Sequence, residues 1–504
     1  MRRLKKKDAK NLDWVDKAPA VAMIATIVLQ GSYFPIEYMS ISLVICIILL
    51  YRLSLKQDHV YINKSVMVLS LLLCSMYVIS TVFVSCDKYA AATETFKVFG
   101  FMLFLAVCLT QRNKIALLGG TLIGILCVSV VGLTAYIGKW GIDSMLLEDR
   151  GLLRLQSIIQ YANTTALLMG IGFFISLYFM ERQKENSKKT VYAAVGYVLL
   201  ISLVLTFSRS MIGIFTFLLV ITVFCMRGYL MRAAVVLEFV LATAVGYLLN
   251  KLVLGGQSLM AVVLLCLSIL LVVYVFLKLS SIPQLIGKTI YYIFVTLLFV
   301  VPAGIFAVVY FRKLDLLSLM GSTFASRLVY MQDGLSIILK NPIMGIGPGG
   351  WMERQFIYQT AQYFVRYVHN GFIQLALDAG VGALAVFIAI IVIFYVHIIR
   401  KYKKTHEFYY FIILMIMTLI MLHSLLDIDM SFLSVNAIIA QCIAIAVEDQ
   451  SKGCSTKTGL YKRYVKPAMV IFLVITVYYI IGDISFQKAQ QSFINKDFKT
   501  AERM

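Results

Sequence analysis

Three arginines and one histidine are the residues of this chain whose chemistry stands out, because charged side chains are rare among its apolar segments. Arg209 lies between two apolar segments that have almost no loop between them, Arg327 lies in a polar insert, and His369 directly precedes another apolar segment. Arg154 stands at the mouth of a further segment, with Asn163 nearby. Guanidinium forks match the geometry of phosphate oxygens, and an imidazole can take a proton from an alcohol near neutral pH. The set therefore predicts a site that binds a phosphate group beside a general base.

Other candidates in the same regions each have a purely structural alternative. His423 and Asp427 are four residues apart, which would place them on one helical face, where they either serve the site or form a hydrogen-bonded pair that closes the helix. Gly347 lies in the stretch GIGPGG, whose backbone N–H groups suit phosphate oxygens, although such a stretch is more often only a turn. Asn370 follows the histidine and joins the substrate-binding candidates. The alternative for Arg209 is an arginine that snorkels at a helix end.

These side chains must be positioned by helices that cross a membrane. The chain of 504 residues is 61% hydrophobic, with a mean hydropathy of +0.88. Apolar runs of about 20 residues recur, each long enough to cross a bilayer core of roughly 30 Å as a helix. Alternating, strand-like patterns are absent, so the sequence predicts an all-α, polytopic membrane helical bundle of about 12 to 15 spans. The expected spans are 18–34, 36–52, 66–84, 94–110, 115–137, 158–180, 190–207, 210–227, 231–249, 258–279, 286–311, 370–399, 408–425, 430–447 and 466–483.

The distribution of positive charge predicts how these spans are oriented. The net charge is +21, and a basic cluster opens the chain at residues 2–7. When the N-terminus is placed in the cytoplasm, most of the lysines and arginines fall in loops on that side, which is the usual bias of membrane proteins. The charge thus needs no nucleic acid to explain it. The same orientation predicts a multi-pass protein of the cytoplasmic (plasma) membrane in which the polar insert 312–369 and the C-terminus are extracytoplasmic.

Four stretches of the chain resemble one known family. They are RLQSIIQYANTTALLM, TFSRS, SRLVYMQDGLSIILKNPIMGIGPGGW and HNGFIQLALDAGVGALAVF, in this order. Over roughly residues 75 to 445 the chain resembles the O-antigen ligase and polymerase family of integral membrane glycosyltransferases. The resemblance implies an enzyme that transfers an undecaprenyl-diphosphate-linked glycan to a hydroxyl of a glycan, lipid or protein acceptor, by an inverting displacement without nucleotide sugar, metal or cofactor. It also implies that Arg209 and Arg327 contact the diphosphate and that His369 activates the acceptor.

The resemblance also frames the domain organisation. We expect a transmembrane catalytic domain over residues 1–483, including the extracytoplasmic loop of about 312–369, in which 323–339 should form a helix that ends at Asn341-Pro342. In the tail, 484–504, apolar residues recur at near-helical spacing with turn residues at 495–497, which resembles the start of a tetratricopeptide repeat. Because one such unit cannot bury its own apolar face, a simple amphipathic helical tail is the alternative.

Several functional questions stay open at this point. The motifs do not separate a ligase from a polymerase, and they identify neither the sugar nor the acceptor. The alternative function is a transporter or flippase of polar lipid-linked substrates, which would need polar residues along a path through the bilayer, whereas the candidates gather on one side. A scaffold whose tail recruits partners is a third hypothesis, and it leaves the arginines unexplained.

Overall fold

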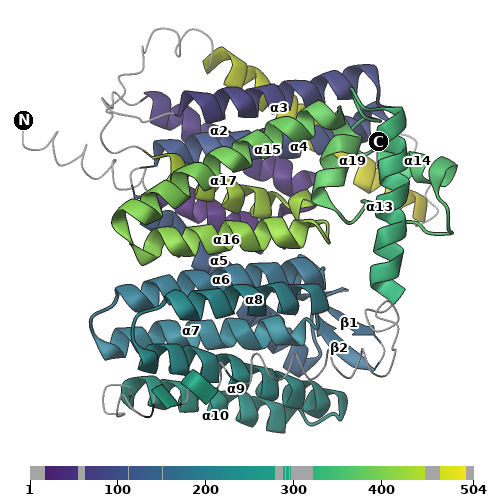
Figure 1. Cartoon of the computed structure of the whole chain (residues 1–504). Coiled ribbons are helices and arrows are strands. Elements are labelled where there is room, and N and C mark those ends of the chain that lie inside the picture. Colours follow the sequence, from purple (N-terminus) through teal and green to yellow (C-terminus); the bar gives the residue numbers. More distant parts are fainter. Residues whose placement is uncertain are drawn as a thin grey trace, which may run out of the picture.

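The fold is a bundle of long apolar helices (Figure 1). The computed structural model describes residues 17–54, 63–111, 113–142, 144–149, 151–278, 322–448 and 466–494, with isolated positions between 286 and 296. Within these residues, ten helices are long and apolar enough to cross a membrane: α2 (Pro35–Ser54), α3 (Lys64–Phe83), α4 (Lys88–Thr110), α5 (Lys114–Gly138), α6 (Ala162–Arg182), α7 (Asn186–Leu205), α9 (Tyr229–Leu254), α10 (Ser258–Lys278), α15 (Gly371–Thr405) and α19 (Lys466–Ile494). Shorter apolar helices are Lys17–Val28, α8 (Arg209–Cys225), α16 (Phe408–Ser424) and α17 (Leu433–Val447). The prediction of an all-α polytopic membrane protein is confirmed.

The expected spans match these helices one for one wherever the structure describes the chain. The span expected at 286–311 lies almost entirely outside the described residues. In the polar insert, the helix expected at 323–339 is present as α13 (Ser322–Lys340), which ends directly before Asn341-Pro342. Helix α19 continues from the last expected span into the tail as far as Ile494. The turn expected at 495–497 lies outside the described residues.

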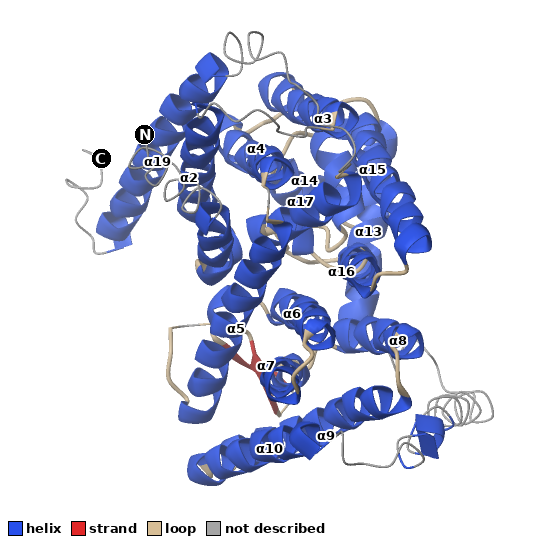
Figure 2. Ribbon diagram, turned by 90° about the vertical axis from the view of Figure 1, so that its left-hand side faces the viewer, coloured by secondary structure: helices blue, strands red, loops and turns tan. Residues whose placement is uncertain are grey.

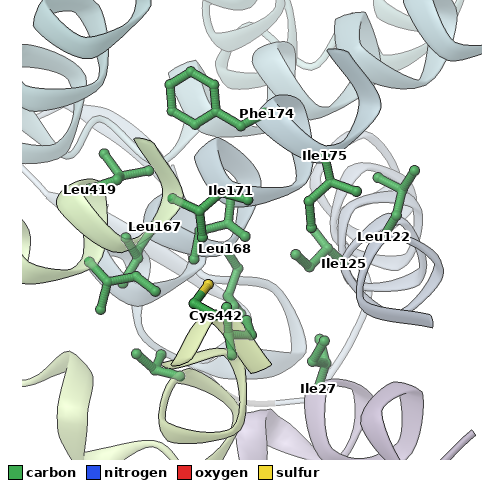
Figure 3. Packing of buried hydrophobic residues seen from close by; sticks show 14 of the residues in the cluster. Ile27, Leu122, Ile125, Leu167, Leu168, Ile171, Phe174, Ile175, Leu419 and Cys442 are labelled. Atoms are coloured by element: carbon green, nitrogen blue, oxygen red, sulfur yellow. The ribbon is translucent and has the colours of Figure 1, made fainter. Parts of the chain in front are cut away.

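Helix α6 lies at the centre of the packing, with α5, α7, α8 and α16 as neighbours (Figure 2). It is apolar all round, which is typical of a helix that is buried on every side. Figure 3 shows side chains of α6 packed with those of α5, α16 and α17, among them Leu122, Ile125, Leu167, Leu168, Ile171, Phe174, Ile175, Leu419 and Cys442. Because lipid tails are as apolar as leucine, such contacts stabilise a membrane bundle through close packing rather than through exclusion of water. Gly172 permits this approach, since a Cβ there would lie 2.8 Å from Ile125 and 2.9 Å from Leu199.

One end of the bundle carries a short β-hairpin, and we call it the hairpin end (right in Figure 1). Strands β1 (Leu146–Asp149) and β2 (Leu152–Leu155) pair antiparallel between α5 and α6. Helices α13 and α14 (Gly350–Tyr358) lie at the same end. The hairpin was not among the expected elements, because strands of four residues are too short for alternation to be recognised. The leucines on either side of Arg154 are buried, so strand alternation places Arg154 on the opposite face of β2.

Helix α15 is interrupted where the polar insert docks on it. Gly380 has a φ of 85°, which a helix does not allow. The turn after α13 supplies backbone groups at the break: the N–H of Ile346 donates to the carbonyl of Leu377 at 2.7 Å, and the N–H of Val381 donates to that of Pro342 at 2.8 Å. A Cβ on Gly380 would lie 2.0 Å from a carbonyl oxygen of the same turn. The insert is therefore fixed directly to the beginning of α15.

Candidate active site

A buried ion pair joins the polar insert to the bundle at the hairpin end. The guanidinium of Arg327, on α13, lies 2.9 Å from the carboxylate of Asp427 and donates to the carbonyl of Leu426 at 2.7 Å. Asp427 is fully buried and also accepts hydrogen bonds from the Tyr161 hydroxyl and the Asn163 amide, each at 2.6 Å. The structure thus brings together Arg327, Asn163 and Asp427, three site residues predicted from separate parts of the sequence.

Arg154 extends this cluster toward the TFSRS stretch. Its Nε donates to the carbonyl of Thr206 at 2.9 Å, and its second amino group donates to the Asn163 side chain at 3.3 Å. Asp149, across the hairpin, lies 3.6 Å away as a weak ionic partner. Arg154 therefore links β2, the start of α6 and the turn between α7 and α8.

Arg209 is exposed at the first position of α8. Among the residues that the structure describes, no hydrogen bond or ion pair is formed with its side chain. Its neighbours are tied to the site, since Thr206 accepts from Arg154 and the Ser210 hydroxyl lies 3.3 Å from Nε2 of His423. Arg209 thus presents a solvated guanidinium at the edge of the cluster.

His423 and its hydrogen-bond partners lie next to the turn that carries Arg209. Its Nδ1 is 2.6 Å from the carboxylate of Asp429, and both side chains are fully buried. The other oxygen of Asp429 accepts from the Thr164 hydroxyl at 2.9 Å. These contacts hold the loop after α16 against α6 and α8.

The expected helical pairing of His423 with Asp427 is wrong. Helix α16 ends at Ser424, so the four-residue spacing no longer places the two side chains on one helical face. His423 pairs with Asp429 instead, and Asp427 is left to pair with Arg327.

His369 and Asn370 lie between the insert and the bundle. His369 has a φ of 56°, a left-handed conformation that costs energy for a residue with a side chain. Its Nδ1 lies 3.0 Å from the carbonyl of Tyr367, and because a carbonyl only accepts, the proton resides on Nδ1 and Nε2 can accept another. The Asn370 side chain caps α15 and donates to the carbonyl of Leu425 at 2.9 Å. The histidine is therefore fixed beside the loop that carries Asp427.

Burial of His369 favours its neutral form. Burial lowers the pKa of the imidazole below the ordinary 6.5, Asp427 opposes this shift, and Arg327 adds to it. Burial by itself would raise the pKa of Asp427, but the charge of Arg327 holds that pKa below the ordinary 3.8. At neutral pH the site therefore contains a neutral base next to a buried, ionised pair.

Gly347 lies on the other side of the insert, against α3. Its φ is 92°, and a Cβ there would lie 2.2 Å from the Ser85 hydroxyl. A glycine is therefore required for the insert to pack against the end of α3. No contact in the described part of the chain joins Gly347 to the arginine cluster.

Backbone strain is concentrated at the hairpin end. Among the described residues, nine that are not glycine have positive φ, and all but His406 lie in the loops of this end: Gln30, Ser32, Lys139, Ser144, Ser157, Gln160, Phe207 and His369. Strained residues persist where the surrounding structure holds them, and they gather at functional sites. Their distribution agrees with the position of the cluster.

Several residues that complete the site were given no role of their own from the sequence. Tyr161, Thr164 and Asp429 all contact predicted site residues, and each lies within two residues of one in the sequence. The only indication in the sequence was therefore that each of them lies close to a predicted site residue. No group of three or more His, Cys, Asp or Glu side chains that could hold a metal ion occurs within the ranges that the structure describes.

One family of known proteins matches part of the chain. Residues 249–388, which include Arg327 and His369, match a family model described as O-antigen ligase. No curated protein matches the chain. This match to part of the chain, together with ten apolar helices of membrane-spanning length among the described residues, supports an assignment to the O-antigen ligase and polymerase family, whose type of reaction is glycan transfer.

Proposed function

We propose that this protein transfers an undecaprenyl-diphosphate-linked glycan to an acceptor hydroxyl at the outer face of the cytoplasmic membrane. One observation carries the proposal: Arg327, Arg154 and the turn that holds Arg209 meet around Asp427 at one end of the bundle, with His369 beside them. A lipid-anchored diphosphate presents its charge at the membrane surface, where these side chains lie if the hairpin end is extracytoplasmic.

The arginines are assigned the role of binding the diphosphate, which is the leaving group of the reaction. Exposed Arg209 is available to meet the diphosphate first, and Arg327 then exchanges its bond to Asp427 for bonds to phosphate oxygens. Bidentate guanidinium–phosphate pairs are among the strongest charge-assisted hydrogen bonds. They stabilise the charge that develops on the diphosphate as it leaves, the role that a divalent cation has elsewhere. Asn163, Asn370, His423 and Gly347 are assigned to holding the substrate or the walls of the site.

His369 is assigned to the acceptor. Nε2 takes the proton of the acceptor hydroxyl while its oxygen attacks the anomeric carbon of the donor sugar. A new carbon–oxygen bond forms, the bond from that carbon to the diphosphate oxygen breaks, and undecaprenyl diphosphate leaves with the bonding electron pair. The configuration at the anomeric carbon is inverted.

The test uses purified protein in liposomes with an undecaprenyl-diphosphate-linked oligosaccharide and a panel of hydroxyl acceptors, followed by mass analysis of the products. We expect wild-type protein to give glycosylated acceptor and free undecaprenyl diphosphate, and His369→Ala and Arg327→Gln to give neither. His397→Ala and Arg400→Gln, both near the opposite end of α15, are the matched controls and should match wild type. Full transfer by His369→Ala or Arg327→Gln would overturn the proposal. So would a protein that moves the donor across the bilayer of acceptor-free liposomes but glycosylates no acceptor in the transfer assay, which is the behaviour of a flippase.

A further inference from the structure

An open pocket with about 720 Å³ of empty space, solvent at its mouth included, lies next to His369, between α3, α4, α15 and α17. Ile428 and Ser431, from the loop that also carries Asp427, form part of its wall. Arg327 and Asp427 do not line it. The pocket and the arginine cluster are therefore distinct, and His369 and this loop lie between them.

The first polar feature of the pocket is a lysine buried within α4. Lys97 lies 2.8 Å from the carboxylate of Glu94 and donates to the Tyr367 hydroxyl at 2.9 Å. Its ammonium also lies about 5 Å from the rings of Tyr33 and Tyr38, in the range of cation–π contacts. A charged side chain inside a membrane helix is costly, and for this reason it marks a functional site.

The second polar feature is a carboxyl group on α15, two residues before the break at Gly380. Asp378 is buried, and its two oxygens accept hydrogen bonds from Gln374 at 2.8 Å and from the Tyr77 hydroxyl at 3.3 Å. Each carboxyl oxygen can accept more than one hydrogen bond, so acceptor capacity remains on the pocket side. Asp378 and Glu94 both line the pocket together with His369.

The composition of the lining indicates what the pocket binds. Two carboxyl groups and one ammonium line it; Glu94 pairs with this ammonium and with Arg366, which leaves Asp378 as the carboxyl group that forms no ion pair in the described part of the chain. The lining therefore offers a diphosphate no unpaired cation, whereas the neighbouring guanidinium groups suit it far better. Carboxyl, amide and phenol groups instead match a molecule that carries several hydroxyls. Beneath them, Leu73, Phe101 and Phe387 supply an apolar floor for the C–H face of a sugar ring.

We infer that this pocket is the acceptor subsite and that it takes an uncharged sugar rather than a phosphorylated or acidic one. The inference rests on the proposed function, because the sugar in this pocket would be the acceptor whose hydroxyl His369 deprotonates. Asp378 and Glu94 are positioning residues for the acceptor hydroxyls. The donor lies on the arginine side of His369 and the acceptor on the pocket side.

The experiment measures release of undecaprenyl diphosphate from the lipid-linked oligosaccharide in the presence of defined acceptor probes. The neutral probes are the p-nitrophenyl β-glycosides of glucose, galactose and N-acetylglucosamine, and p-nitrophenyl β-glucuronide is the acidic counterpart of the glucoside. At least one neutral probe should accelerate release and become glycosylated, and the glucuronide should be about tenfold weaker or worse, as expected for a carboxylate placed against carboxyl groups. Equal or better use of the glucuronide, or no response to any neutral probe, overturns the inference.

Two variants then locate the acceptor. Asp378→Asn keeps the shape of the side chain, and Val98→Phe fills space in the pocket. Each should raise the KM for the neutral acceptor about tenfold or more while the KM for the donor changes less than about twofold. The controls are Asp333→Asn, a buried carboxyl group outside the pocket, and Val68→Phe, on an exposed face of α3.

The outcomes separate this inference from the proposed function. If Arg327→Gln abolishes release but the pocket variants behave like their controls, or change the KM for the donor instead, the acceptor subsite is wrong and the proposed function stands. If Arg327→Gln retains full release, the proposed function itself fails.

Discussion

The guanidinium of Arg327 and the carboxylate of Asp427 meet at 2.9 Å, although one belongs to the polar insert and the other to the loop after α16. Asn163 of α6 donates to the same carboxylate oxygen. One buried carboxyl group thus connects three separate parts of the chain. Asp427 therefore holds the arginine in position before a substrate arrives.

Breaking this pair should destabilise the protein. Arg327→Gln leaves Asp427 as a buried charge without its cation, and loss of one partner of a buried pair costs about 3–5 kcal/mol. We expect a clearly lower melting temperature in detergent, partly restored in the double variant Arg327→Gln/Asp427→Asn, which removes both charges. Lys188→Ala, which breaks an exposed pair with Glu185, is the control and should leave the melting temperature almost unchanged. A single variant as stable as wild type would show that the pair contributes little.

Arg327→Lys should separate stability from activity. Lysine keeps the charge that Asp427 needs, but it lacks the planar fork that binds two phosphate oxygens at once. We expect the melting temperature to fall less than in Arg327→Gln, while kcat/KM falls by about tenfold or more. The check is steady-state kinetics beside thermal unfolding, and a lysine variant with wild-type kcat/KM would mean that only the charge matters.

The activity should depend on pH through His369. The imidazole must be neutral to accept a proton, and its pKa lies below the ordinary 6.5 because of burial. We expect kcat/KM to fall as the pH drops through a midpoint below 6.5 and to be constant above it. Since the folded state binds this proton less tightly than the unfolded chain, His369 favours folding above its unfolded pKa, and this contribution is lost as the pH falls through the folded pKa. A midpoint above 6.5 in the pH–rate profile would contradict this environment for the base.

Gly380→Ala should disrupt docking of the insert. The residue has a φ of 85°, and the new Cβ would lie 2.0 Å from the Ile343 carbonyl oxygen, so the strain of roughly 1–3 kcal/mol adds to a backbone clash. We expect a lower melting temperature and faster proteolysis within the insert. Gly482→Ala is the matched control, because Gly482 lies within a helix and nothing would contact its Cβ. That control should be neutral or slightly stabilising, and equal behaviour of the two variants would refute the proposed role of Gly380.

The sequence predicted the helices better than the contacts between them. Length and hydropathy alone predict a membrane helix, so the spans and the insert helix α13 could be placed in advance. The pairing of His423 with Asp427 failed because helix ends depend on local backbone geometry, and α16 stops before Asp427. Convergence of Arg154, Arg327 and His369 could only be hypothesised, since their spacing in the chain says nothing about distance. The pocket around Lys97 was missed because a single lysine within an apolar run shows neither its burial nor its partners.

The interruption of α15 has a mechanical consequence. Backbone groups of the turn after α13 fill the gap at Gly380, so α13 and the first two turns of α15 are joined through the main chain. Arg327 lies on α13 and His369 directly precedes α15, so this joint links the guanidinium to the base independently of Asp427. The start of α15 is in turn anchored in the bundle, because Asp378 accepts from the Tyr77 hydroxyl and Asn370 donates to the carbonyl of Leu425.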